Sequence, residues 1–150
     1  FLKIMTKNTI GRIDKVDFPE FGLLDIESKV DTGAYTSAIH AHKIEESNVN
    51  GKNFISFTLL DPEHVQYNEK VFRTQNYSKK IIKSSNGTSE ERFVVKTTIT
   101  LFKKTYTIEL TLSERSDMKY PILLGRKFLT KKFIVDTSQK NNSYKLKQRT

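Results

Sequence analysis

The chain has 150 residues, no cysteine and a formal net charge of +9 at pH 7. This length is enough for one domain with its own core, and a hydrophobic content of 36%, including ten Phe and six Tyr, excludes a disordered chain. The lack of cysteine excludes disulfides and thiolate zinc sites, and no apolar run is long enough to span a membrane, so no membrane partner is expected.

One domain over residues 1–150 is expected, with frayed ends. Residues 1–8 have no clear pattern, and the opening Phe1-Leu-Lys-Ile-Met5 is too short and too mixed for a signal peptide, so we expect the natural start at Met5. The end of the chain is polar and predicts a frayed tail over 140–150. The absence of cysteine favours a reducing compartment, and we therefore expect a cytoplasmic protein.

The positive charge is unevenly distributed. Acidic residues concentrate near the start, whereas basic residues concentrate in the tail and in the middle of the chain. The middle basic residues are Lys70, Arg73, Lys79, Lys80 and Lys83. Such a surface prefers anionic partners, although a simple solvated surface would have the same composition.

Strand patterns dominate the chain. Alternating or short apolar runs predict strands at 9–16, 23–30, 37–44, 54–60, 71–77, 79–83, 93–101, 106–112, 121–124 and 132–136. Pro19, Gly22, Gly51 and Asp61-Pro62 mark turns between them, and residues 125–131 allow at most two helical turns. Many short strands with one small helix near the C-terminus predict an all-β protein built as a single closed barrel.

The pair Asn86-Gly87 predicts a tight hairpin turn, because both residues tolerate positive φ. The surrounding residues, from Ser84 to Ser89, are polar and have little to bury, so the tip is expected to move freely. An ordinary surface turn would have the same sequence.

The most distinctive stretch runs from Lys29 to His40 and contains Asp31-Thr32-Gly33. Strand patterns precede and follow it, which predicts a carboxylate on a tight turn between two strands. Gly33 allows the chain to fold back close to that carboxylate, and Thr32 supplies a hydroxyl for bracing.

This stretch resembles the catalytic loop of retropepsin-like aspartic peptidases. A second match lies far downstream, where Ile122-Leu-Leu-Gly-Arg126 and the short helix after it resemble the segment that backs that loop. More closely, the stretches 82–92 and 118–126 resemble a bacterial family labelled ATP-dependent zinc proteases. Members of that family often accompany ATP-grasp ligases that add glutamate residues to a ribosomal protein.

The resemblance implies a retropepsin-like barrel in which Asp31, Thr32 and Gly33 form the catalytic loop. Peptide hydrolysis by carboxylates needs two of them sharing one proton, because like charges in contact cannot both ionise. The chain supplies one such loop, so a homodimer would bring two copies of Asp31 to its two-fold axis, with Thr32 bracing the two loops. The expected function is that of a homodimeric aspartic endopeptidase.

The resemblance also implies where substrate binds. The loop would contribute Ala34 and Tyr35, and the Asn86 hairpin corresponds to a flap that closes over substrate. The candidate substrate-binding residues of this flap are Lys83, Ser85, Asn86, Gly87, Thr88 and Arg92. The family implies glutamate-rich tails as substrate, which cations would attract. The cations that we expect to hold such a tail are Lys79, Lys80, Lys83, Arg92 and Lys119.

Two positions leave alternatives open. Tyr35 stands where retropepsins commonly have a second aspartate that pairs with the arginine of Gly-Arg, so Arg126 is expected either to cap the short helix or to pair with Glu27. Asp136, in Val135-Asp-Thr-Ser138, imitates a second catalytic motif. Because a chain of this length has no room for a second lobe, a turn aspartate is the alternative.

No cofactor is expected. The chain has no His-Glu-x-x-His and no Gly-x-x-x-x-Gly-Lys-Ser/Thr motif, so neither zinc nor ATP is expected to bind. His40 and His42 have a spacing that can ligate a metal, but the sequence offers no third ligand. The alternative for His40 is a structural hydrogen bond near the Asp31 loop.

Two other functional classes are alternatives. A nucleic-acid-binding barrel would explain the charge, but no strand interleaves aromatic and basic residues in the manner of a recognised RNA motif, so nucleic acid is not the expected partner. A non-catalytic interaction domain would keep the barrel without the chemistry.

Overall fold

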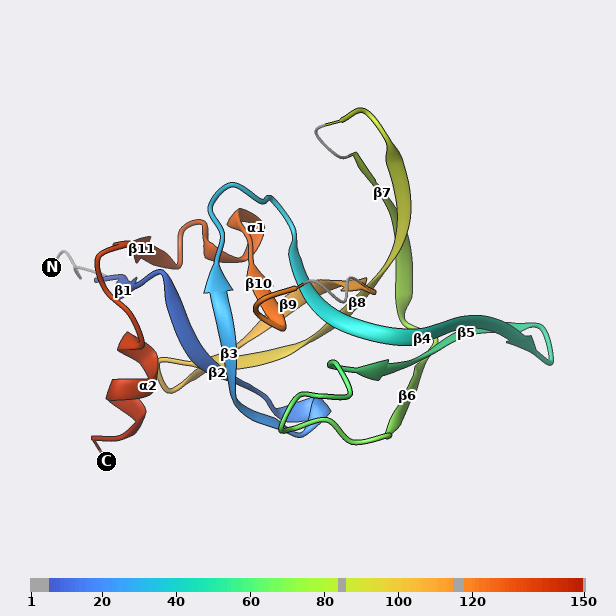
Figure 1. Cartoon of the computed structure of the whole chain (residues 1–150), viewed down its shortest axis with the longest axis horizontal. Helices are drawn as coiled ribbons and strands as arrows, with labels where there is room; N and C mark the ends of the chain where they lie inside the picture. Colours follow the sequence, from blue (N-terminus) through green and yellow to red (C-terminus); the bar gives the residue numbers. More distant parts are fainter. Residues whose placement is uncertain (1–5, 84–85, 115–117, 150) are drawn as a thin grey trace, which may run out of the picture.

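The computed structural model describes residues 6–83, 86–114 and 118–149 and consists mainly of strands, which confirms the predicted all-β class (Figure 1). Its strands are β1 (Asn8–Ile10), β2 (Ile13–Phe18), β3 (Leu23–Val30), β4 (Ser37–Val49), β5 (Lys52–Leu59), β6 (Val71–Thr74), β7 (Tyr77–Lys83), β8 (Ser89–Leu101), β9 (Lys104–Ser113), β10 (Ile122–Leu124) and β11 (Phe133–Val135). Its helices are the 3-10 helix η1 (Pro19–Phe21), α1 (Arg126–Leu129) and α2 (Asn142–Lys147). Across the described ranges, no helix is both long enough and apolar enough to cross a membrane.

A ring of strands forms the body of the molecule. The strands pair in the order β10-β3-β2-β8-β9-β4, and β4 pairs again with β10, which closes the ring. β10 completes the closure because it pairs in parallel with β3 on one side and antiparallel with β4 on the other. β2 and β8 pair at Asp17–Thr100, so the strand pairing at this part of the ring is short. The predicted barrel is therefore present in a nearly closed form.

The alternation of apolar residues explains the core. β2 alternates between partly buried and buried residues along its whole length, and the two long strands β8 and β9 turn their apolar faces into the ring. Burial of each large apolar side chain contributes about 1.5–3 kcal/mol. The side chains that fill the ring include Phe18, Ile26, Ile39, Ile99, Leu110 and Leu124.

Two hairpins extend beyond the ring (Figure 1). β4 continues to Val49, past the predicted end at residue 44, and forms a long arm with β5. β7 and β8 form the second hairpin, which is paired from Tyr77–Val95 to Lys83–Ser89. This second hairpin is the one that the Asn86-Gly87 turn predicted.

The end of the chain is helical, so the frayed tail predicted over 140–150 is wrong for residues 142–147. These residues form α2, which packs beside β1 and β2 (Figure 1). The buried Asp14 carboxylate accepts a hydrogen bond from the Ser143 N–H at 2.9 Å, and the Ser143 hydroxyl accepts one from the Phe102 N–H at 2.7 Å. The sequence pattern missed α2 because its first turn is held by a carboxylate from the distant strand β2.

Of the residues 1–8 that were expected to be frayed, residues 1–5 lie outside the described ranges. Asn8 already begins β1, which pairs in parallel with β11.

Candidate functional site

The Asp31 loop joins β3 to β4. The Asp31 N–H donates to the Leu124 carbonyl at 2.9 Å, which extends the β3–β10 pairing by one residue. Inside the loop, the Ala34 N–H donates to the Asp31 carbonyl at 3.2 Å, and the Gly33 N–H donates to Asp31 Oδ1 at 3.1 Å. The predicted turn between two strands is thus present, and the carboxylate is oriented by the backbone of its own loop.

The first turn of α1 holds this loop from behind. The N–H groups of Arg126 and Lys127 donate to the carbonyls of Ala34 and Tyr35, each at 2.9 Å. The loop and α1 lie side by side in Figure 1. The two stretches that carry the sequence resemblance therefore meet in the structure.

Gly125 explains why a glycine precedes α1. An added Cβ would lie 2.5 Å from the Thr36 carbonyl oxygen and 2.8 Å from that of Tyr35, which is closer than any side chain allows. The Gly125 N–H also donates to the hydroxyl of the buried Ser37 at 2.9 Å. The close approach of the two backbones requires glycine at this position.

Arg126 contacts the Asp31-Thr32-Gly33 turn directly. Its Nη1 donates to the Thr32 carbonyl at 2.8 Å, and its guanidinium carbon lies 5.8 Å from the centre of the Tyr35 ring. This contact differs from both predicted alternatives, a helix cap and a pair with Glu27. Tyr35, which stands where retropepsins commonly have a second aspartate, contributes a cation–π interaction to Arg126.

The tip of the Asp31 loop faces solvent. Thr32 and Gly33 are exposed, Asp31 is partly buried, and Tyr35 is 57% exposed. The loop therefore combines a fixed backbone with a carboxylate that another molecule can approach.

The β7–β8 hairpin is the candidate flap. At its tip the Asn86 side-chain oxygen accepts hydrogen bonds from the Thr88 N–H at 3.2 Å and the Thr88 hydroxyl at 2.8 Å. Gly87 has a φ of 85°, which favours glycine, and Lys83 is exposed at the end of β7. Ser85, which was also predicted to bind substrate, lies outside the described residues.

Glu46 on the β4–β5 arm anchors the base of this hairpin. It accepts a hydrogen bond from the Tyr77 hydroxyl at 2.5 Å and pairs with Lys79 at 2.9 Å. The hydrogen bond to Glu46 raises the pKa of Tyr77 to about 12. The Tyr77 hydroxyl and then Lys79 lower the pKa of Glu46 below its ordinary value.

Comparison with known proteins agrees with this arrangement. A family model described as the retropepsin-like aspartic endopeptidase RimB matches residues 9–145. The chain belongs to this RimB-like family. Membership explains why the Asp31 loop and the Gly125 segment occur together in one chain.

Curated relatives of this RimB-like chain are much longer proteins. A protein of Desulfotalea psychrophila is 40% identical over 134 residues, which cover 88% of this chain and 28% of that protein. A protein of Shewanella pealeana is 37% identical over 136 residues, which cover 89% of this chain and 29% of that protein. Both are named "Probable alpha-L-glutamate ligase". The RimB-like chain thus spans less than a third of these relatives.

A solved structure has the same fold. The crystal structure of a Legionella pneumophila protein of unknown function superposes with a TM-score of 0.72 at 26% identity and covers 92% of this chain and 99% of that chain. The RimB-like fold therefore also occurs in a chain not much longer than the matched region.

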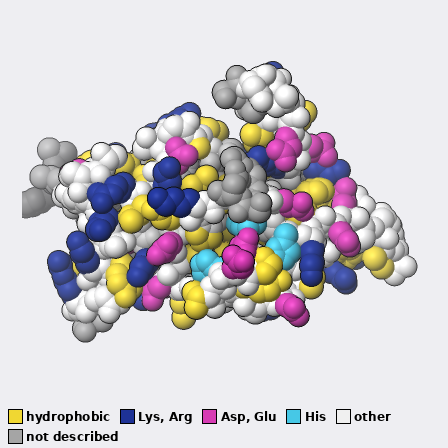
Figure 2. Space-filling model, in the orientation of Figure 1, with side chains coloured by type: hydrophobic (Ala, Val, Ile, Leu, Met, Phe, Trp, Pro, Cys, Tyr) yellow, Lys and Arg dark blue, Asp and Glu magenta, His cyan; other side chains and the backbone are white. Residues whose placement is uncertain are grey.

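Most of the cations predicted beside the flap are already engaged. Figure 2 shows Lys and Arg side chains on the viewed face interleaved with acidic ones. The partners are Glu46 for Lys79 at 2.9 Å, Glu90 for Arg92 at 3.0 Å and the Tyr120 ring for Lys119 at 5.8 Å. Lys80 differs, because it lines a pocket.

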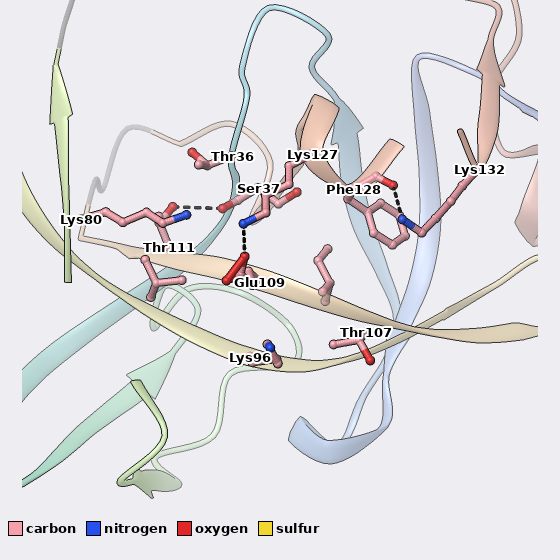
Figure 3. Close-up of a pocket in the computed structure, with 12 residues that line it drawn as sticks. Thr36, Ser37, Lys80, Lys96, Thr107, Glu109, Thr111, Lys127, Phe128 and Lys132 are labelled. Carbon is pink, nitrogen blue, oxygen red and sulfur yellow. Dashed lines mark hydrogen bonds and ion pairs between the residues drawn. The ribbon is translucent and has the colours of Figure 1, made fainter. Parts of the chain in front are cut away.

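This pocket, of about 250 Å³, lies between α1, the exit of the Asp31 loop and strands β7, β8 and β9 (Figure 3). Its lysines are Lys80, Lys96, Lys127 and Lys132. Lys127 pairs with Glu109 and, together with Lys80 and Lys96, lowers the pKa of that carboxyl. Of these lysines, only Lys80 was predicted from the sequence to hold substrate. Lys96 pairs with Glu109 across β8 and β9, which places these two residues on one polar face.

Asp136 is a turn aspartate. Its Oδ1 accepts hydrogen bonds from the Ser138 N–H at 2.9 Å and the Ser138 hydroxyl at 2.6 Å, and its Oδ2 accepts one from Gln139 at 3.0 Å. The Ser138 hydroxyl lowers the pKa of Asp136. These contacts agree with the turn alternative for this residue.

Histidine side chains are visible near the middle of the face shown in Figure 2. His40 is buried in β4, and burial lowers its pKa, while its backbone N–H donates to the Pro121 carbonyl at 2.9 Å. His42 Nε2 lies 3.3 Å from the Tyr67 hydroxyl. In residues 6–83, 86–114 and 118–149, no group of three or more His, Cys, Asp or Glu side chains could hold a metal ion.

Proposed function

We propose that the protein is an aspartic endopeptidase that works as a homodimer, in which Asp31 of each chain contributes one half of the catalytic dyad. The observation that carries the proposal is the Asp31 loop. Its backbone is fixed by Leu124 and by the first turn of α1, while the tip that bears the carboxylate is open to solvent. Membership of the RimB-like family supports the reaction class.

In the proposed reaction the two Asp31 carboxylates share one proton. The ionised carboxylate takes a proton from water as the water attacks the peptide carbonyl, and the protonated one donates to the carbonyl oxygen. The Gly33 N–H orients the carboxylate through Oδ1, and Arg126 holds the Thr32 carbonyl. Fixed geometry of this kind lowers the barrier because reacting groups need no reorganisation.

We propose glutamate-rich peptide tails as the substrate. Support comes from the longer relatives, which are named glutamate ligases and contain a region like this chain. A domain joined to an enzyme that adds glutamate is well placed to act on the same peptides. The net charge of +9 also favours acidic substrates over basic ones.

Asp31→Asn tests the chemistry. Asparagine has nearly the same shape but cannot ionise, so turnover of a glutamate-tailed peptide should fall by about a thousandfold or more, with the fold intact by circular dichroism. Asp136→Asn is the matched control, because it changes the other Asp-Thr pair at a turn outside the proposed dyad, and its kcat should stay close to wild type. Turnover retained in folded Asp31→Asn would overturn the proposal.

Mixing tests the homodimer. Wild-type chains combined with an excess of Asp31→Asn form mixed dimers that lack one carboxylate, so activity should fall more steeply than simple dilution. A fall in direct proportion to the wild-type fraction would mean that each chain works alone. Sedimentation of both proteins gives the oligomeric state independently.

A further inference from the structure

The lysine pocket beside the Asp31 loop has no part in the reaction proposed above. It is formed by separate elements, since Thr36 comes from the loop exit, Lys80 from β7 and Lys127 from α1. Its volume of about 250 Å³ is below the range of roughly 300–1,000 Å³ that drug-sized ligands occupy. The pocket therefore suits a side chain better than a whole cofactor.

The charges of the pocket are not balanced. Four lysines line the pocket, and among the described residues that line it Glu109 carries the negative charge. Glu109 pairs with Lys127. Lys80, Lys96 and Lys132 form no ion pair with any carboxylate in the described ranges. Lys132 donates instead to the Phe128 carbonyl at 3.1 Å, whereas Lys80 and Lys96 act on Glu109 electrostatically. A second carboxylate would therefore find Lys80 and Lys96, whose charge is not neutralised by an ion pair of their own.

The walls of the pocket suit a carboxylate on a short aliphatic stem. Val94, Ile108 and Phe128 supply apolar surface next to the lysines. The side chain of Glu109 itself has this character, and its carboxylate already lies against Lys127 (Figure 3). The pair of Glu109 with Lys127 thus shows, inside the pocket, the kind of contact that Lys80 and Lys96 would make with the carboxylate of a substrate.

We propose that this pocket is a specificity site that binds the side-chain carboxylate of an acidic residue in the peptide substrate, with Lys80 and Lys96 as the recognising cations. The inference rests on the proposed function, because an extended peptide held at Asp31 would pass between the loop exit and β7, and both elements border the pocket. Residues of the peptide away from the cleaved bond would then decide which tails are bound.

The chemistry of the lining favours a carboxylate over a phosphate. Among the described residues, the lining contains no arginine, which is the side chain whose forked donors best match phosphate. Glu109 would also repel a doubly charged phosphate more strongly than a singly charged carboxylate.

Kinetics test the site. Lys80→Gln and Lys96→Gln each remove one cation and leave a slightly shorter polar side chain, and each is expected to raise KM for a glutamate-tailed peptide about two- to fivefold at low salt, with kcat unchanged. For a peptide with glutamine in place of glutamate, neither variant should change KM. Lys52→Gln is the matched control, since it removes the same charge from the exposed β5 end of the arm. Equal KM effects from Lys52→Gln would overturn the proposal.

Binding separates this site from the peptidase activity. Fluorescence anisotropy of a labelled tetraglutamate peptide on Asp31→Asn protein needs no turnover. Weaker binding after adding Lys80→Gln and Lys96→Gln to Asp31→Asn supports the pocket even if the protein proves to have no peptidase activity. Unchanged binding in that triple variant overturns the pocket and leaves the Asp31 proposal standing. Stronger competition by inorganic phosphate than by free glutamate at equal ionic strength would assign the pocket to phosphate and overturn it as well.

Discussion

The Asp31 loop and the β7–β8 hairpin, which is the candidate flap, are held in opposite ways. The loop is bonded along its backbone to β10 and α1, and Gly125 leaves no free space behind it. The flap is anchored at its base by Glu46, whereas a Cβ added at Gly87 near its tip would have no atom of the described residues within 4 Å. The difference fits the proposed roles, because a catalytic group needs a fixed position and a cover must open and close.

The two glycines provide the largest test of this comparison. Gly125→Ala forces a Cβ against two backbone carbonyls, so the free energy of unfolding should fall by about 2–3 kcal/mol and peptidase activity should be lost. Gly87→Ala places its Cβ against none of the described residues and disfavours the positive φ, which costs about 1 kcal/mol. Urea unfolding measures the free energy of unfolding of both variants, and an unchanged m value shows that the difference is one of stability. Equal losses of stability would mean that the loop is no more tightly packed than the flap.

The same contrast explains how far the sequence could predict this molecule. Alternation predicted β3 at its observed bounds and a strand over 93–101, which lies within β8, because a strand pattern is local. The resemblance predicted that the Asp31 loop and the Gly125 segment lie together. The lysine pocket was missed because its residues come from elements far apart in the chain, and α2 was missed because its first turn donates hydrogen bonds to Asp14 of the distant strand β2. Contacts between residues far apart in the chain produce no regular spacing of apolar and polar residues that a sequence pattern could detect.

Arg126 gives the second test, since it connects the fixed loop to α1. Arg126→Ala removes the hydrogen bond to the Thr32 carbonyl and the contact with Tyr35, so kcat/KM should fall about ten- to a hundredfold through misplacement of Asp31. Arg126→Lys keeps the charge but loses the flat guanidinium, and should recover only part of the activity.

Tyr35→Phe is the control for Arg126, because the ring that faces the guanidinium is kept. Its kcat/KM should stay within about twofold of wild type, since the cation–π interaction does not need the hydroxyl. A loss as large as that of Arg126→Ala would show that the Tyr35 hydroxyl, and not the ring, is what matters.

Glu46 gives the smallest effect, because it acts only at the base of the flap. Glu46→Gln removes the charge that pairs with Lys79 and weakens the bond to Tyr77. Amide hydrogen exchange in β7 should become faster, while kcat/KM should change less than about fivefold, because in the proposed role the flap must open in every turnover anyway. Unchanged exchange in β7 would mean that the backbone pairing with β8 alone holds the flap.

The pH dependence of this anchor follows from the two shifts that Glu46 and Tyr77 impose on each other. The pKa of Glu46 is lowered, so its contribution to stability is present above the ordinary value of 4.5 and is lost as the pH falls through the lowered pKa. The pKa of Tyr77 is raised to about 12, so its contribution is present below the ordinary value of 10.0 and is lost as the pH rises through about 12. The anchor therefore holds throughout the range between 4.5 and 10.0 and cannot work as a switch at neutral pH. In Glu46→Gln the tyrosinate absorbance should show the pKa of Tyr77 falling from about 12 toward 10.0, because the hydrogen bond to Glu46 is the largest cause of the shift. A tyrosine that still titrates near 12 would mean that Glu46 is not the cause.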